Sequence, residues 1–202
     1  MILEEKIKEV QWLAPAGLQV SLRIRFGSAL NCINTYPSEW ILKYTELGFM
    51  MRDPTVEWAY ASTGTCRWST FSDADTHGVL KLAASYGIHF GTTISCRSEN
   101  TDGHRTIASF GRQDREFEDA ELAHLYRFIQ NLHDAVAPPV NLTNAEIEAL
   151  LLLKRGLIIK EVAEELNISE NAVKQRMSNA RRKLDAKTTI HAASLAQQYG
   201  LI

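Results

Sequence analysis

The sequence predicts an α+β protein, with an N-terminal α/β/α sandwich around an antiparallel sheet and a small all-α domain of four helices. Three observations predict this class. Apolar and polar residues alternate over Leu18–Phe26, which is typical of a half-buried strand. Strands and helices then follow in the order β, α, β, α, β, β, α, which favours a sheet packed between helices. Beyond residue 141 the pattern is entirely helical.

The length of 202 residues suits one larger and one smaller domain. The segment Asp134–Asn141 contains two adjacent prolines, which lack N–H donors and disfavour helix in the residue before them. We therefore expect a domain over residues 1–135, a linker over 136–141 and a second domain over 142–202.

Composition excludes several classes of protein. Hydrophobic residues make up 45% of the chain, enough for two cores, yet no apolar run reaches membrane-spanning length. The start, MILEEKIKEV, does not have the pattern of a signal peptide. Cys32, Cys66 and Cys96 are odd in number and lack metal-ligand spacing. The sequence predicts a cytoplasmic protein with reduced thiols, no metal site and no membrane partner.

After the first strand, a helix is expected over residues 37–51, with apolar side chains at Trp40, Ile41, Tyr44, Leu47 and Phe49. A short strand is expected over Glu57–Ser62. Ser72 and Asp75 have the spacing of a capping box, which predicts a further helix. The apolar residues of that helix recur at helical spacing: Val79, Leu82, Ala83 and Tyr86.

Two more strands are expected over Ile88–Cys96 and Arg105–Phe110, joined by the turn-rich segment 98–103. A long helix is expected over about Asp114–Ala137. One face of it carries the apolar residues Leu122, Leu125, Phe128, Ile129, Leu132 and Val136.

The second domain begins with a capping box of Thr143 and Glu146, and Gly156 ends the helix that follows. Ile159, Val162, Ala163 and Leu166 form the apolar stripe of a second helix. After the turn at residues 167–169, Ser169 can cap a third helix. A short helix, a tight turn and a basic helix are typical of the DNA-binding helix-turn-helix motif.

Charge agrees with that interpretation. The stretch Glu170–Lys187 has six basic and two acidic residues, whereas residues 1–139 have 13 basic and 17 acidic ones. An acidic body with a small basic module fits a regulator better than a protein that coats DNA. A solvated charged face is the alternative explanation. We expect the chain to bind double-stranded DNA.

The third helix predicts which side chains contact DNA. Residues expected to face base edges are Asn171, Lys174, Gln175 and Ser178, with Lys174 as the main base contact and guanine as the candidate base. Residues expected to grip phosphates are Arg176, Arg181, Arg182 and Lys183. So short a helix holds little specificity alone, which predicts a homodimer on an inverted-repeat operator. The segment Thr188–Tyr199 and the helix at 114–137 are candidate partner contacts, although either apolar stripe could be core.

Three aromatic residues, Tyr36, Trp40 and Tyr44, have four-residue spacing and share one helix face. They are either a core stripe or one wall of a ligand site. Asp53, before Pro54, is a turn residue, a helix cap or an acceptor for a ligand N–H.

These residues, with others along the chain, resemble the pattern of a known family. From about Leu18 to Ile202 the chain resembles LuxR-type quorum-sensing regulators, which have an acyl-homoserine-lactone-binding domain before a helix-turn-helix domain. The matching motifs are Tyr36-x3-Trp40-x3-Tyr44, Asp53-Pro54, Trp68, Gly87, Glu146-x3-Leu150-x5-Gly156 and Ala180-Arg-Arg-Lys-Leu184 through Ala196 to Gly200-Leu-Ile202. Two features depart from the family's pattern: Ser95-Cys96 stands where a proline is frequent, and the segment before Leu18 is short.

The resemblance implies an N-acyl-homoserine lactone as ligand, no cofactor, and RNA polymerase as a partner. It implies that Trp40 donates to the lactone carbonyl, Asp53 accepts from the ligand amide and Tyr36 donates to the acyl carbonyl. Side chains implied to wall the ligand are Tyr44, Val56, Trp68, Val79, Ala83 and Ile88. Ser109 adds a hydroxyl contact, unless Ile107 occupies that position.

Three other functions can be compared with these residues. A phosphorylation-controlled receiver needs a pair of acidic residues after the first strand, and Gly-Ser-Ala-Leu-Asn stands there instead. An enzyme is not expected, because no nucleophile elbow or phosphate loop occurs and the six histidines share no motif. A partner that titrates other regulators stays open, as does a family member that binds a different ligand or none.

Overall fold

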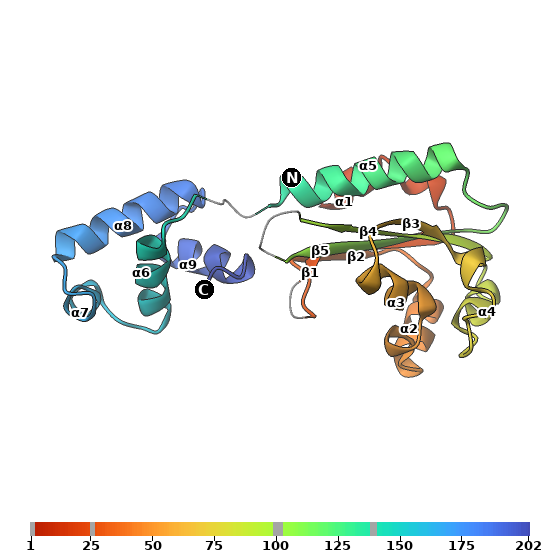
Figure 1. The fold of residues 1–202 in the computed structure, drawn as a ribbon, viewed down its shortest axis with the longest axis horizontal. Coiled ribbons are helices and arrows are strands. Elements are labelled where there is room, and N and C mark those ends of the chain that lie inside the picture. Colours follow the sequence, from red (N-terminus) through yellow and green to blue (C-terminus); the bar gives the residue numbers. More distant parts are fainter. Residues whose placement is uncertain (1–2, 25–26, 99–102, 138–140) are drawn as a thin grey trace. The chain divides into compact units, whose positions relative to one another are not determined.

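The computed structural model describes residues 3–24, 27–98, 103–137 and 141–202, which form two compact units, Met1–Val136 and Ala137–Ile202 (Figure 1). Three expected features lie outside the described residues: the end of the first strand at Phe26, the turn at 99–102 and the prolines of the linker at 138–139.

The first unit is built on a five-stranded antiparallel sheet with the strand order β2-β1-β5-β4-β3. The strands are β1 (Gly17–Ile24), β2 (Asn31–Asn34), β3 (Gly64–Arg67), β4 (Phe90–Arg97) and β5 (Arg105–Arg112). This sheet and its helices confirm the predicted α+β class.

Helices cover both faces of the sheet (Figure 1). Helix α5 (Asp119–Ala135) and the short α1 (Leu3–Ile7) lie on one face. Helices α2 (Ser38–Glu46), α3 (Pro54–Ala61) and α4 (Val79–Ala84) lie on the other, with the 3-10 turns η2 (Phe49–Met51) and η3 (Trp68–Phe71) between them; η1 (Gln11–Leu13) precedes β1.

The main core lies between the sheet and α5. Leu18, Val20 and Leu22 of β1 are buried there against α5 residues that include Leu125 and Ile129. The apolar stripe of α5 is therefore core in this unit rather than a free surface. Because strand side chains alternate, the intervening residues of β1 point to the opposite face, under α2–α4.

The strand expected over Glu57–Ser62 is wrong, because these residues belong mostly to helix α3. Asp53 caps this helix through a hydrogen bond from the Thr55 amide, and Pro54 occupies the first helical turn, where a missing N–H costs nothing. The strand β3 begins only at Gly64.

Other expectations need smaller corrections. Asp75 does cap α4, accepting from the amides of Val79, Leu80 and Lys81 at 2.7–3.1 Å, but Ser72 donates to the Ser69 carbonyl and forms no capping box with it. The helix expected over 37–51 is interrupted at Gly48, whose φ of 62° lies in the left-handed region. The edge strand β2 was not predicted.

The second unit contains α6 (Asn144–Lys154), α7 (Ile159–Glu165), α8 (Glu170–Lys183) and α9 (Thr189–Gln198). The capping box of Thr143 and Glu146 is confirmed: the Glu146 amide donates to Thr143 Oγ1 at 3.3 Å, and the Thr143 amide to Glu146 Oε2 at 2.8 Å. Ser169 caps α8 as expected, accepting from the Ala172 amide at 3.2 Å. Within the described ranges, no helix is long and apolar enough to cross a bilayer.

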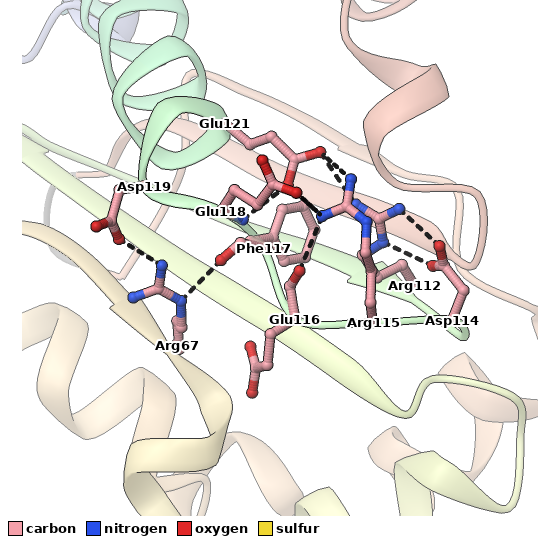
Figure 2. A network of polar contacts seen from close by, with 9 residues as sticks. All are labelled: Arg67, Arg112, Asp114, Arg115, Glu116, Phe117, Glu118, Asp119 and Glu121. Carbon is pink, nitrogen blue, oxygen red and sulfur yellow. Dashed lines mark hydrogen bonds and ion pairs between the residues drawn. The ribbon is translucent and has the colours of Figure 1, made fainter.

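A network of arginines and carboxylates leads from the end of β5 into α5 (Figure 2). Arg112 donates to Asp114 at 2.7 and 2.9 Å and contacts Glu121 at 3.2 Å. Arg115 donates to both oxygens of Glu121, and the Glu118 amide donates to the same carboxylate at 2.8 Å. These hydrogen bonds hold residues 113–118 in a loop, so α5 begins at Asp119 rather than at the expected 114.

We expect the Glu121 carboxylate to stabilise the fold at neutral pH and to lose this effect in acid. The hydrogen bonds from Arg115 lower the pKa of Glu121 to about 2, from 4.5. A lowered pKa means that the stabilisation is complete above pH 4.5 and disappears as the pH falls towards 2. Glu121→Gln should therefore lower the melting temperature at pH 7, and the gap from the wild type should narrow by pH 3, measured by circular dichroism. A gap that stays constant over this range would contradict the assignment.

Candidate functional site

A cavity of about 220 Å³ lies between the second face of the sheet and helices α2, α3 and α4. Its lining contains all but one of the residues predicted to bind a ligand: Tyr36, Trp40, Tyr44, Asp53, Val56, Trp68, Val79, Ala83 and Ser109. Residues from elements far apart in sequence are thus brought to one space. Both Ser109 and Ile107, which the sequence left as alternatives, line it.

Ile88 is the exception. Its side chain is 1% exposed and belongs to the cluster that backs the cavity, with Tyr36 and Trp40. It lies against Gly111, where an added Cβ would come within 2.6 Å of Ile88 Cγ2. Ile88 therefore packs behind the residues that line the cavity. Periodicity along the sequence does not show whether an apolar residue lines a cavity or lies behind its lining.

Asp53 is both a helix cap and part of the cavity lining. Its Oδ1 accepts from the Thr55 amide at 2.8 Å, and its Oδ2 accepts from the Tyr44 hydroxyl at 2.9 Å. Burial raises the pKa of this carboxyl, although the hydrogen bonds from Thr55 and Tyr44 act in the opposite direction. A carboxylate has about four lone-pair positions. The Thr55 side chain and the Val56 amide also act on this carboxyl, so a ligand N–H would compete with them for the positions that remain.

Two of the tyrosines that line the cavity, Tyr36 and Tyr44, remain protonated donors. Burial, followed by the nearby Asp53 carboxylate, raises the pKa of Tyr44 far above its usual value. Burial is also the main cause that raises the pKa of Tyr36. The Tyr36 hydroxyl donates to Ser109 Oγ at 3.2 Å.

The indole N–H of Trp40 brings a hydrogen-bond donor to the lining of the cavity. Its ring is 5% exposed and packs edge-on against Tyr44, with centroids 5.4 Å apart. Among the described residues, its indole N–H has no hydrogen-bond partner, although the residue lines the cavity. Trp68 differs, because its indole N–H already donates to Thr93 Oγ1 at 2.9 Å.

Gly91 makes the position of Trp68 possible. A Cβ on Gly91 would lie 2.2 Å from Trp68 Cδ2, so only glycine lets the indole lie flat on β4. Sequence reasoning missed this residue, because a glycine inside a strand does not show which side chain covers it.

Sequence reasoning also missed the polar residues that the sheet presents to the cavity, Gln19, Ser21, Asn34 and Thr93. Alternation in β1 predicted that Gln19 and Ser21 face away from the core. It could not show that α2–α4 cover this face as well. Within the described ranges, no group of three or more His, Cys, Asp or Glu side chains could hold a metal ion.

In the second unit, α8 has one buried and one outward side. Val173, Met177 and Ala180 are buried in the unit's core. With 3.6 residues per turn, the opposite side carries the predicted base-edge residues Asn171, Gln175 and Ser178, together with Arg182. All four are exposed. Lys174 is exposed on the flank, with its ammonium 3.8 Å from Glu170.

The remaining basic residues of α8 have partners within the unit or lie at its flanks. Lys183 Nζ donates to Glu146 Oε2 at 2.8 Å and to the Asn141 carbonyl at 2.7 Å. Arg176 reaches the Ala145 carbonyl at 3.5 Å, and Arg181 is half-buried. Lys183 thus holds the start of α6, and its contact with a phosphate stays a prediction.

The family comparisons match both units. A family described as "Autoinducer binding domain" matches residues 27–137. A second, described as "Bacterial regulatory proteins, luxR family", matches residues 140–196. The chain belongs to the LuxR family of bacterial regulatory proteins.

Individual relatives agree with this assignment. The chain is similar to the transcriptional activator protein AnoR of Acinetobacter nosocomialis, with 31% identity over 92% of this chain and 84% of AnoR. It is 26% identical to the transcriptional activator protein RaiR of Rhizobium etli, over 77% of this chain and 70% of RaiR. The crystal structure of Escherichia coli SdiA has the same fold, with a TM-score of 0.54 and 24% identity over 100% of this chain and 92% of SdiA.

In this LuxR-family chain we expect Arg182 to contact a DNA phosphate. Arg182→Ala should weaken binding about equally for all DNA sequences and reduce the slope of log K against log salt by about one. Fluorescence anisotropy with random-sequence DNA between 50 and 200 mM NaCl measures both. Arg127→Ala, which removes an exposed arginine from α5, is the matched control and should leave the slope unchanged. An unchanged slope for Arg182→Ala would contradict the assignment.

Proposed function

We propose that this chain is a DNA-binding transcriptional regulator that an N-acyl-homoserine lactone controls in quorum sensing. The family matches make the chain a regulator with an autoinducer-binding domain. The observation that supports the lactone is the set of polar groups in the cavity: the Asp53 carboxylate, the Tyr36 hydroxyl and a Trp40 indole N–H that has no hydrogen-bond partner in the described part of the chain.

These groups complement the chemistry of such a lactone. The ligand has two carbonyl acceptors and one amide donor, held on an apolar chain. Trp40 donates to the lactone carbonyl, Tyr36 donates to the acyl carbonyl, and Asp53 accepts from the amide N–H. Val56, Val79 and Ala83 supply apolar wall. An apolar cavity with a few polar groups that fix orientation is the usual form of a small-molecule site.

The cavity is small for the range of roughly 300–1,000 Å³ that ligand pockets occupy. At about 220 Å³, it favours a short acyl chain over a long one. No step of this proposal involves a cofactor, a metal or catalysis.

In this proposal the second unit binds DNA. The outward face of α8 enters the major groove of double-stranded DNA, and a homodimer matches an inverted-repeat operator. Ile190 of α9 is 84% exposed while Ala192 and Ala196 of the same helix are buried in the unit's core. This exposed isoleucine supports α9 as the contact between two copies. The regulator acts in the cytoplasm, where it meets DNA and RNA polymerase.

Asp53→Asn tests the ligand class. Asparagine caps helices as well as aspartate does, so α3 should persist. It replaces an acceptor-only group by one that also presents N–H donors, which oppose the ligand amide. The wild type, expressed with a panel of synthetic N-acyl-homoserine lactones, should retain one of them through purification, detected by mass spectrometry. Asp53→Asn should retain at least tenfold less.

Asp75→Asn is the control, because Asp75 also caps a helix but does not line the cavity. It should retain the lactone at the wild-type level. A folded wild-type protein that retains no lactone would contradict the proposed ligand class. Equal retention by Asp53→Asn would contradict the role of the carboxylate.

A further inference from the structure

The sheet presents a polar row to the cavity. Asn34 of β2 lies opposite Gln19 of β1, Gln19 lies opposite Ser109 of β5, and Ser109 lies opposite Thr93 of β4. Residues directly opposite each other point to the same face of a sheet. All four line the cavity, so its floor is a band of amides and hydroxyls across four strands.

Two residues of this row already accept hydrogen bonds from the aromatic residues of the cavity. Ser109 accepts from the Tyr36 hydroxyl, and Thr93 accepts from Trp68. Gln19 and Asn34 belong to neither contact. They extend the row towards the edge strand β2, where Asn34 is exposed.

Gln19 keeps unused hydrogen-bonding capacity. Its Nε2 donates to Ser21 Oγ at 2.6 Å and lies 3.8 Å from Cys32 Sγ. Within the described part of the chain its Oε1 has no partner. Asn34 Oδ1 accepts from the Tyr36 amide at 3.1 Å, which leaves the Asn34 side-chain N–H groups for other acceptors.

A plain hydrocarbon chain on this floor would remove these groups from water without replacing their hydrogen bonds, which is unfavourable. A hydroxyl group both donates and accepts, so it pairs with a carboxamide in either orientation. A carbonyl only accepts and would leave Gln19 Oε1 without a donor.

The position of Gln19 in the sheet determines where on the ligand a hydroxyl group could contact it. Neighbouring strands lie about 4.8 Å apart. Gln19 is therefore one strand spacing from Ser109, to which the Tyr36 hydroxyl is bonded. A hydroxyl on the acyl chain a few atoms beyond an acyl carbonyl bound at Tyr36 would stand beside the Gln19 carboxamide.

We propose that the ligand is an N-acyl-homoserine lactone with a hydroxyl group on its acyl chain, and that Gln19 selects it. This inference rests on the proposed function, since it places the acyl carbonyl at Tyr36. Gln19 is thus a specificity-determining residue, with Ser21 orienting its carboxamide.

The test compares lactones of one chain length that are unsubstituted, oxo-substituted or hydroxyl-substituted near the acyl carbonyl. Affinity for the full chain is measured by isothermal titration calorimetry for the wild type, Gln19→Leu, Gln19→Met and Gln130→Leu. Gln130→Leu makes the same change at an exposed position on α5, away from the cavity. Two variants at residue 19 guard against a folding defect in one of them.

The wild type and Gln130→Leu should bind the hydroxyl-substituted lactone about tenfold more tightly than the unsubstituted one, a ratio expected for one hydrogen bond. Gln19→Leu and Gln19→Met should bind the two about equally. Equal binding by the wild type, a preference for the oxo form, or a preference that persists without Gln19 would overturn the inference and leave the lactone class intact. Binding of no lactone at all would overturn both.

Discussion

The buried Asp53 carboxylate is the interaction on which the sensing unit depends. It begins α3 by accepting from the Thr55 amide, and it joins α3 to α2 through the Tyr44 hydroxyl. A carboxylate that is 8% exposed needs hydrogen-bond donors to offset the loss of water. One group therefore serves the fold, the packing of two helices and the lining of the cavity.

This sharing couples the ligand to stability. A molecule that binds only the folded state stabilises it in proportion to the logarithm of its concentration over its dissociation constant. A donor from the ligand to Asp53 adds to the bonds that hold α2 and α3 over the sheet. In our proposal, ligand binding thus favours an ordered sensing unit, and an ordered unit favours the dimer that reads DNA.

Local signals predicted much of the molecule. The capping box of Thr143 and Glu146, the cap at Ser169 and the helical stripes predicted the helices of the second unit, and alternation in β1 predicted the first strand. The strand expected over Glu57–Ser62 was wrong because the cap at Asp53 outweighed the β-forming residues that follow. The short edge strand β2, Asn31–Asn34, has too few residues to show a pattern.

The cavity was harder to predict where it depends on tertiary packing. The aromatic residues and Asp53 stood out by type and spacing. Gln19 and Ser21 belong to the polar side of β1; the predicted sandwich places helices on that side as well, but alternation does not show that a cavity lies between them. Ile88 packs against Gly111, and Lys183 pairs with Glu146 at the start of α6; spacing along the sequence reveals neither contact.

The most direct test of the central claim follows the Trp40 indole N–H by ¹⁵N NMR as lactone is added, with its resonance assigned from Trp40→Phe. Our account predicts that this resonance moves downfield, as expected for an N–H that gains an acceptor, while the indole of Trp68, already bonded to Thr93, moves little. Lactone binding that leaves the Trp40 resonance in place would contradict it.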